Sequence, residues 1–131
     1  MDIILAIKPE WAAKIYSGEK IVEWRKTKPK NFRECDDVIL YETAPVKKIN
    51  GFLKLYGIIK INPENLSKRH PLIKYGFIDK KDLEKYAGGK TVYALLIKHA
   101  EKFTPSGEEL KKFGVKKDPQ SWVYCKNWRD D

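Results

Sequence analysis

The chain has 131 residues, with 27 basic against 18 acidic side chains and a net charge of +9. A chain of this length buries roughly two thirds of the surface that its unfolded form exposes, so a single domain over 1–131 needs no disulfide or metal to fold. Its 42% hydrophobic and 34% charged residues exclude a disordered chain, and its longest apolar run, Val92 to Ile97, is too short to cross a membrane. The first residues lack the basic start of a secretory signal, which predicts a cytoplasmic protein.

The positive charge suits a polyanionic partner such as a nucleic acid. Only four of the 27 basic residues are arginine, namely Arg25, Arg33, Arg69 and Arg129. Lysine meets phosphate as a point charge, whereas arginine makes most bidentate contacts with guanine. The composition therefore favours contact with a nucleic-acid backbone over reading of a long duplex sequence. A lysine-rich surface that only keeps the chain soluble is the alternative.

The first part of the chain predicts two strands joined by a helix. Ile3–Ile7 reads as a strand, and Pro9 suits the first turn of a helix that continues over Glu10–Ser17. Gly18 stands where a left-handed helix cap belongs. The following Lys20–Lys26 alternates apolar and charged residues, as a strand with two different faces does.

The rest of the chain predicts further strands with short helices between them. The strands are Val38–Glu42, Phe52–Ile61 with a bend at Gly57, Thr91–Lys98 and Ser121–Cys125. The helices are one opened by Asn62-Pro63-Glu64 and ended by Pro71, one over Lys80–Tyr86 capped by Asp79 and stopped by Gly88-Gly89, and one from Ser106 to Phe113. This order predicts an α+β fold: a small mixed barrel of five to six strands flanked by short helices.

The segment 17–26 concentrates the charged residues that suggest a site. Glu23 and Arg25 share one face of the predicted strand, and Val22 and Trp24 share the other. Lys20 stands at the start of the strand, where the turn lets its side chain swing to either side. The pattern predicts a cation, an anion and a second cation at one pocket at the end of the barrel. An ordinary surface ion pair, with the tryptophan in the core, is the alternative.

Metal and cofactor sites are not expected. The histidines, His70 and His99, lie far apart, and neither Cys35 nor Cys125 belongs to a paired metal motif. Gly89-Lys90-Thr91 resembles the end of a phosphate-binding loop, but the glycine that such a loop needs five positions earlier is Glu84.

The pattern Gly-x-Lys-x-x-Glu-x-Arg over 18–25, preceded by a Lys-Pro pair and a short helix, resembles the signature of the ASCH domains, relatives of the PUA RNA-binding fold. The opening strand and the late Pro-Gln-Ser-Trp-x-Tyr over 119–124 resemble small stand-alone archaeal and bacterial members. The resemblance implies a six-stranded PUA-like barrel and a cleft lined by Lys20, Glu23 and Arg25, with Ser121 close by.

The ligand implied by this resemblance is RNA or a nucleoside, with DNA as a second candidate and no membrane partner. Lysine and arginine neutralise phosphate, glutamate accepts from an exocyclic amine, and Trp24 or Trp122 could stack on a base. The candidate ligand-binding residues are Lys8, Lys20, Glu23, Trp24, Arg25, Lys26, Gln120, Ser121 and Trp122.

Three functions stay open at this point. The first is a non-catalytic RNA-binding module in RNA metabolism or transcription regulation. The second is a small hydrolase that acts on RNA or a modified nucleoside through Lys20, Glu23 and Ser121; relatives that deacetylate N(4)-acetylcytidine use a lysine and a threonine three residues later, and this chain has Glu23 at the threonine position. The third is a protein-interaction or ligand-sensing domain. The oligomeric state, and whether residues 62–90 cover the cleft or only decorate the barrel, also stay open.

Overall fold

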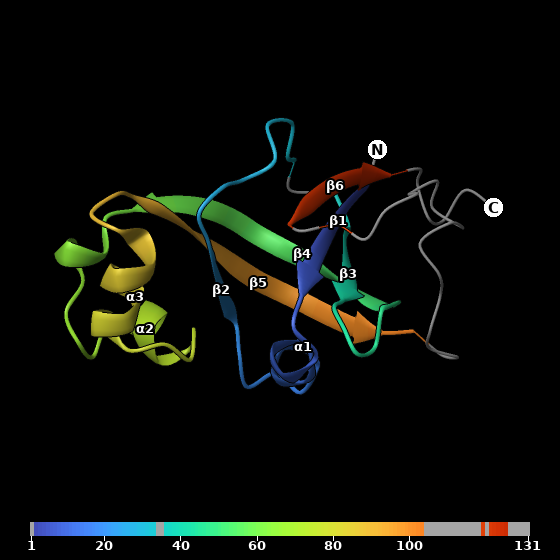
Figure 1. Ribbon diagram of the computed structural model, residues 1–131, viewed down its shortest axis with the longest axis horizontal. Helices are drawn as coiled ribbons and strands as arrows, with labels where there is room; N and C mark the ends of the chain where they lie inside the picture. Colours follow the sequence, from blue (N-terminus) through green and yellow to red (C-terminus); the bar gives the residue numbers. More distant parts are fainter. Residues whose placement is uncertain (1, 34–35, 104–118, 120, 126–131) are drawn as a thin grey trace.

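The computed structural model describes residues 2–33, 36–103, 119 and 121–125. Within these residues six strands form one mixed sheet in the order β2-β5-β4-β3-β1-β6 (Figure 1). Only the neighbours β1 and β3 run parallel. The strands are β1 (Asp2–Ile7), β2 (Val22–Arg25), β3 (Val38–Glu42), β4 (Lys48–Ile61), β5 (Val92–Lys102) and β6 (Trp122–Cys125). The helices are α1 (Pro9–Tyr16), α2 (Pro71–Lys74) and α3 (Lys80–Ala87), with a 3₁₀ turn at Pro63–Asn65. The predicted α+β architecture is confirmed.

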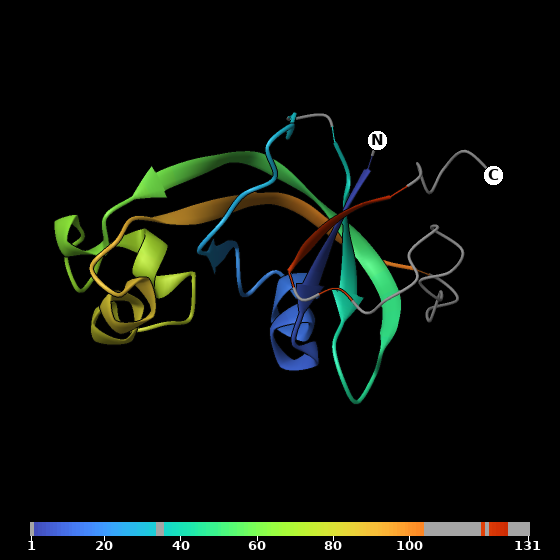
Figure 2. The ribbon, with the colours of Figure 1, turned by 45° about the horizontal axis from the view of Figure 1, so that its top comes forward.

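The two longest strands, β4 and β5, give the sheet its curvature. Their register shifts twice, between Lys54 and Leu55 and between Leu55 and Gly57. Such bulges bend a strand and increase its twist, and Figure 2 shows both strands arching across the molecule. The bend predicted near Gly57 is therefore confirmed, and the sheet curls into a half-barrel around its core.

Side chains, rather than a strand ladder, join the two ends of the curled sheet. The guanidinium of Arg25 in β2 donates from Nη2 to the carbonyl oxygen of Ala6 in β1 at 2.7 Å. Trp122 in β6 donates from Nε1 to the carbonyl oxygen of Thr27, just after β2, at 3.1 Å. Both bonds connect a side chain at one end of the sheet to a main-chain carbonyl near the other end, so they stabilise the closure of the half-barrel.

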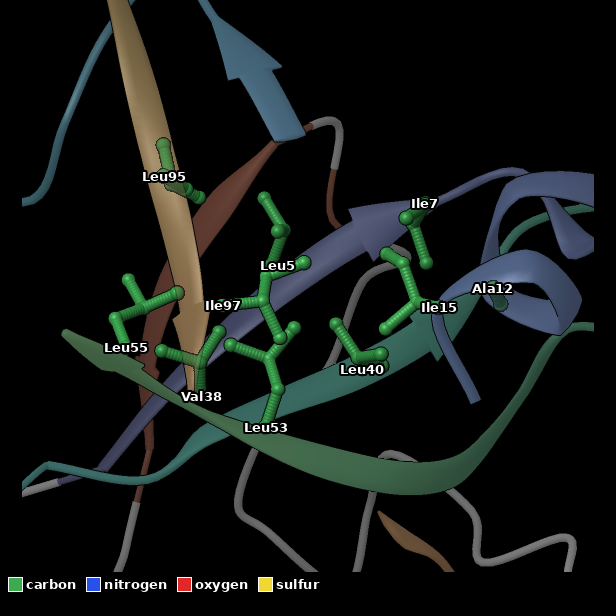
Figure 3. Close-up of a cluster of buried hydrophobic side chains, with 10 residues drawn as sticks. All are labelled: Leu5, Ile7, Ala12, Ile15, Val38, Leu40, Leu53, Leu55, Leu95 and Ile97. Atoms are coloured by element: carbon green, nitrogen blue, oxygen red, sulfur yellow. The ribbon is translucent and has the colours of Figure 1, made fainter. Parts of the chain in front are cut away.

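The main core fills the inside of the half-barrel, with α1 packed against it (Figure 3). Trp11 and Ile15 lie four residues apart on one face of α1, as the sequence predicts; Ile15 is fully buried and Trp11 packs against the cluster. The buried members are Leu5, Ile7, Ala12, Ile15, Val38, Leu40, Leu53, Leu55, Leu95 and Ile97.

Residues 62–90, called here the helical module, have a separate core against the other face of β2. Val22 and Trp24 contribute to this core from β2, which confirms the predicted alternation. The helical module adds Leu66, Ile73, Leu83 and Ala87, and β5 adds Val92 and Ala94. The carbonyl oxygen of Tyr75 also accepts from the main-chain N–H of Ile21 and of Val22, at 3.2 and 3.3 Å. The helical module is thus a packed wall, fixed to β2 by apolar contacts and main-chain hydrogen bonds.

The details of the helical module correct two predictions. Pro71 begins α2 rather than ending a helix, and the segment after Asn62 forms only a 3₁₀ turn. Proline lacks an N–H and has a fixed φ, so it fits the first turn of a helix as well as it terminates one. Asp79 stands at the N-cap position of α3 but makes no side-chain capping bond, whereas the predicted stop is confirmed by the left-handed Gly88.

The helix predicted from Ser106 to Phe113 lies outside the described residues. Among those that are described, no helix is long and apolar enough to span a membrane.

The hydroxyl of Tyr16, at the end of α1, lies in the interior with no hydrogen-bond partner among the described residues. Burial, together with the charge of Glu42, raises the pKa of this phenol. The stability that the neutral phenol provides is complete below the unfolded-state pKa of about 10 and is lost as the pH rises above it.

We therefore expect Tyr16→Phe to be as stable as the wild type at neutral pH, or more stable by up to about 1 kcal/mol, because it removes a buried unpaired hydroxyl. Denaturant unfolding from about pH 8 to pH 11 should show a smaller alkaline loss of stability in this variant. Tyr56→Phe, at a side chain that is 62% exposed, is the control. An alkaline loss of stability identical in wild type and Tyr16→Phe would contradict this expectation.

Candidate functional site

A cavity of about 1380 Å³ lies between the half-barrel and the helical module. Figure 1 shows β2 between α1 on one side and the pair α2 and α3 on the other. The half-barrel and α1 supply Ala6, Ile7, Lys8, Trp11, Lys20, Glu23, Trp24, Arg25 and Thr43. The helical module supplies Lys68, Ile73, Lys74, Gly76, Phe77, Ile78, Asp79, Lys80, Lys81, Asp82, Glu84 and Tyr86. The helical module is therefore one wall of the cavity, which answers the question that the sequence left open.

The predicted trio of charges meets at this cavity as one cluster. Glu23 lies in the middle: its Oε1 is 3.2 Å from Nζ of Lys20, and its Oε2 is 2.8 Å from Nη2 of Arg25. The Nε of Arg25 also donates to Oε2 at 2.8 Å. The side chains are only 4% exposed for Lys20, 9% for Glu23 and 16% for Arg25. The alternative of an ordinary surface ion pair does not apply, because these charges are shielded from bulk water.

Lys20 reaches the cavity, as the position at the turn predicts, and its side chain is held there in one place. Its Nζ donates to the carbonyl oxygens of Val22 and Gly76, both at 2.7 Å, in addition to its contact with Glu23. An ammonium group has three N–H donors, and all three are engaged here. Burial lowers the pKa of Lys20, and the charge of Glu23 opposes that shift. Lys20 therefore acts on the cavity as a fixed positive charge.

Arg25 connects the cluster to β1 and, through it, to Ser121. Ala6 accepts from Arg25 at its carbonyl oxygen, and its own N–H donates to the carbonyl oxygen of Ser121 at 2.8 Å. Ser121 is therefore linked to the cluster through a single residue, Ala6. Its half-buried side chain is not among the described groups that line the cavity.

Two other predicted ligand-binding residues border the cavity. Lys8 is exposed and lines it directly. Trp24 lines it as well, but only 6% of its surface is exposed, so packing in the module's core is its main role.

The remaining predicted residues lie elsewhere. Lys26 is outside the cavity lining, with its Nζ 4.8 Å from the ring centre of Tyr86 at the edge of the cavity. Trp122 is half-buried, packs on the main core and donates to the carbonyl oxygen of Thr27, and it is not among the described residues that line the cavity. Gln120 lies outside the described residues.

The helical module contributes aromatic and basic groups to the cavity that no sequence motif indicates. Phe77 and Tyr86 line the cavity opposite Trp11 of α1, and burial raises the pKa of Tyr86, with Arg25 opposing the shift. Seven lysine or arginine side chains line the cavity against four aspartate or glutamate side chains. Nothing in the local pattern of 62–90 reveals that it folds over β2.

The cavity combines a positive field, one buried carboxylate and several aromatic rings, which together suit a ligand with phosphate and planar base groups. Among the described residues, no three His, Cys, Asp or Glu side chains gather closely enough to hold a metal ion.

Comparison with known proteins gives consistent results. A protein from Zymomonas mobilis described as an ASCH domain-containing ribonuclease is 26% identical over 128 residues, covering 95% of this chain and 84% of its own length. The crystal structure of ASCH from the same organism superposes with a TM-score of 0.77 at 24% identity, over 94% of this chain and 86% of that one. A second solved protein, described only as hypothetical, superposes with a TM-score of 0.51 at 21% identity, over 76% of this chain and 97% of that one. The ASCH domain family matches residues 5–106, and the chain therefore belongs to that family.

Proposed function

We propose that this chain binds RNA in the cavity and cleaves it. The observation that carries the proposal is the buried cluster of Lys20, Glu23 and Arg25 at a cavity whose lining is predominantly cationic. Such a lining attracts phosphate, and the cavity is of a size that takes a nucleotide. The ribonuclease named among the relatives supports RNA as the substrate, because it matches nearly the whole chain.

The cluster supplies the charges that RNA cleavage needs. In the proposed step the ribose 2′-oxygen attacks the neighbouring phosphorus, its proton passes to Glu23, the bond to the 5′-oxygen breaks, and that oxygen takes a proton from water. Oε2 of Glu23 contacts both Nε and Nη2 of Arg25, whereas Oε1 contacts only Nζ of Lys20, so the proton passes to the second lone pair of Oε1. Arg25, the most exposed of the three, and the fixed charge of Lys20 stabilise the negative charge that builds on the phosphoryl oxygens.

Arg25→Met is expected to reduce the rate of RNA cleavage by about 100-fold, because it removes the cation closest to solvent in the cluster. The measurement is the rate of cleavage of an end-labelled single-stranded RNA on a gel, with circular dichroism to establish that the variant is folded. Lys90→Met is the control, because it removes an equal charge at an exposed position outside the cavity lining. A DNA strand of the same sequence, which lacks the 2′-hydroxyl, should stay intact. Equal rates for Arg25→Met and Lys90→Met would contradict the proposed role.

Binding without cleavage is the second candidate function, and one observation favours it. All three donors of Lys20 and both oxygens of Glu23 already have partners within the protein, which is the state of a structural ion cluster. In that case the wild type leaves RNA intact but binds it, with an affinity that falls as the salt concentration rises.

A further inference from the structure

Phe77, in the connection between α2 and α3, has a backbone conformation that is unusual for its type. Its φ is +57°, in the left-handed region that glycine and asparagine occupy readily and that costs a bulky residue free energy. A buried ring could offset that cost by packing, but Phe77 is 37% exposed. The conformation therefore needs another reason, and strained residues of this kind gather at ligand sites.

The ring of Phe77 stands at the cavity and has a cation on one face. Phe77 is part of the cavity lining, and Nζ of Lys14 lies 4.9 Å from the centre of its ring. Lys14 does not line the cavity, whereas Phe77 does, so a flat partner in the cavity would stack on the face of the ring opposite Lys14. An ammonium group beside a stacked base also attracts the phosphate attached to that base.

The position of Phe77 relative to the charged cluster is fixed by the residue before it. The carbonyl oxygen of Gly76 accepts from Nζ of Lys20. A Cβ atom on Gly76 would lie 2.5 Å from Nε1 of Trp24 and 2.8 Å from the carbonyl oxygen of Leu72, so the chain is pressed against the tryptophan there. Phe77 therefore directly follows the carbonyl group that accepts the hydrogen bond from Lys20.

We propose that Phe77 is the stacking platform for a nucleobase of single-stranded RNA, and that it sets the preference of the cavity for unpaired RNA. This inference rests on the proposed function, because it takes RNA as the occupant of the cavity. A base can lie flat on the ring only when it has left its own stack, which a base in a duplex does not do without unpairing. The positive charge of the cavity does not discriminate in this way, because it attracts the phosphates of both forms.

The test uses a single-stranded octamer that is 2′-O-methylated, to block attack by the 2′-oxygen, and that contains 2-aminopurine, whose fluorescence is quenched by stacking. We expect the wild type to quench it and to bind it more tightly than the same octamer in a duplex. Phe77→Leu should weaken binding by roughly tenfold, in line with the measured contribution of one stacked base, and should abolish the quenching. Phe77→Trp should retain both. Phe77→Gly should weaken binding as Phe77→Leu does, with a melting temperature equal to or above that of the wild type, because glycine relieves the backbone strain.

Tyr75→Leu is the matched control. Tyr75 is two residues away, is 39% exposed and has Lys74 at 5.3 Å from its ring centre, but it is not among the described residues that line the cavity. Its replacement should change neither affinity nor quenching. If Phe77→Leu binds and quenches like the wild type while Arg25→Met loses affinity, the stacking role is overturned and the proposed function stands. If the wild type does not bind the octamer, both are overturned.

Discussion

Replacing Glu23 with leucine is expected to lower the free energy of unfolding by about 3–5 kcal/mol and to abolish RNA cleavage. The carboxylate separates two cations, one of which, Lys20, has a side chain only 4% exposed. Without Glu23, that ammonium group stays buried with no opposite charge beside it, and its hydrogen bonds to two carbonyl oxygens do not replace the lost charge. Denaturant unfolding at neutral pH measures the change.

The pH dependence of Glu23→Leu gives a second readout. Burial already lowers the pKa of Lys20, and loss of Glu23 removes the contact that opposes this shift. Between the lowered pKa of Lys20 in the folded variant and the unfolded lysine pKa of about 10.4, the folded state binds fewer protons than the unfolded state, so the stability of the variant should rise with pH through that range.

The double variant Lys20→Met/Glu23→Leu should recover much of the lost stability, because it removes both members of the buried pair, but it should stay inactive. A double variant no more stable than Glu23→Leu alone would contradict this account of the cluster.

Gly76→Ala is expected to lower the free energy of unfolding by about 1–3 kcal/mol and to slow RNA cleavage. The added methyl group would overlap the indole of Trp24 and the carbonyl oxygen of Leu72, and the second of these is backbone that does not move aside easily. A shift of Gly76 also displaces the carbonyl oxygen that holds Lys20.

Gly57→Ala in β4 is the control for the loss of glycine itself, because a Cβ atom there would have nothing within 4 Å. Glycine inside a strand is slightly unfavourable, so this variant should be at least as stable as the wild type. Equal stability of Gly76→Ala and Gly57→Ala, measured by thermal and denaturant unfolding, would show that the contact with Trp24 is not tight.

Much of the half-barrel could be predicted because its signals are local. The alternation over 20–26 correctly assigned Val22 and Trp24 to one face of β2 and Glu23 and Arg25 to the other. The strand Val38–Glu42 matches its predicted bounds, and Gly88 ends α3 as expected of a residue that accepts a left-handed conformation. The strand is indicated by the alternation of apolar and charged residues, and the helix end by a single glycine, so both signals are local.

The candidate site could be predicted only in part, because its geometry depends on distant contacts. The pattern placed three charges near one another, but Lys20 is immobilised by the carbonyl oxygen of Gly76, 56 positions away in the sequence. A local pattern contains no information about that contact. For the same reason the local pattern predicts neither the aromatic wall of the cavity nor the hydrogen bond from Trp122 to Thr27 that joins the ends of the half-barrel.

The proposed function requires RNA to occupy the cavity between the half-barrel and the helical module. The most direct test is a proton–nitrogen NMR titration of the labelled protein with the 2′-O-methylated single-stranded octamer. We expect salt-sensitive shifts at the cavity, above all at the main-chain amides of Lys8, Arg25, Gly76 and Phe77. Shifts confined to residues that do not line the cavity, such as Tyr56 and Lys98, would contradict it, as would the absence of any shift.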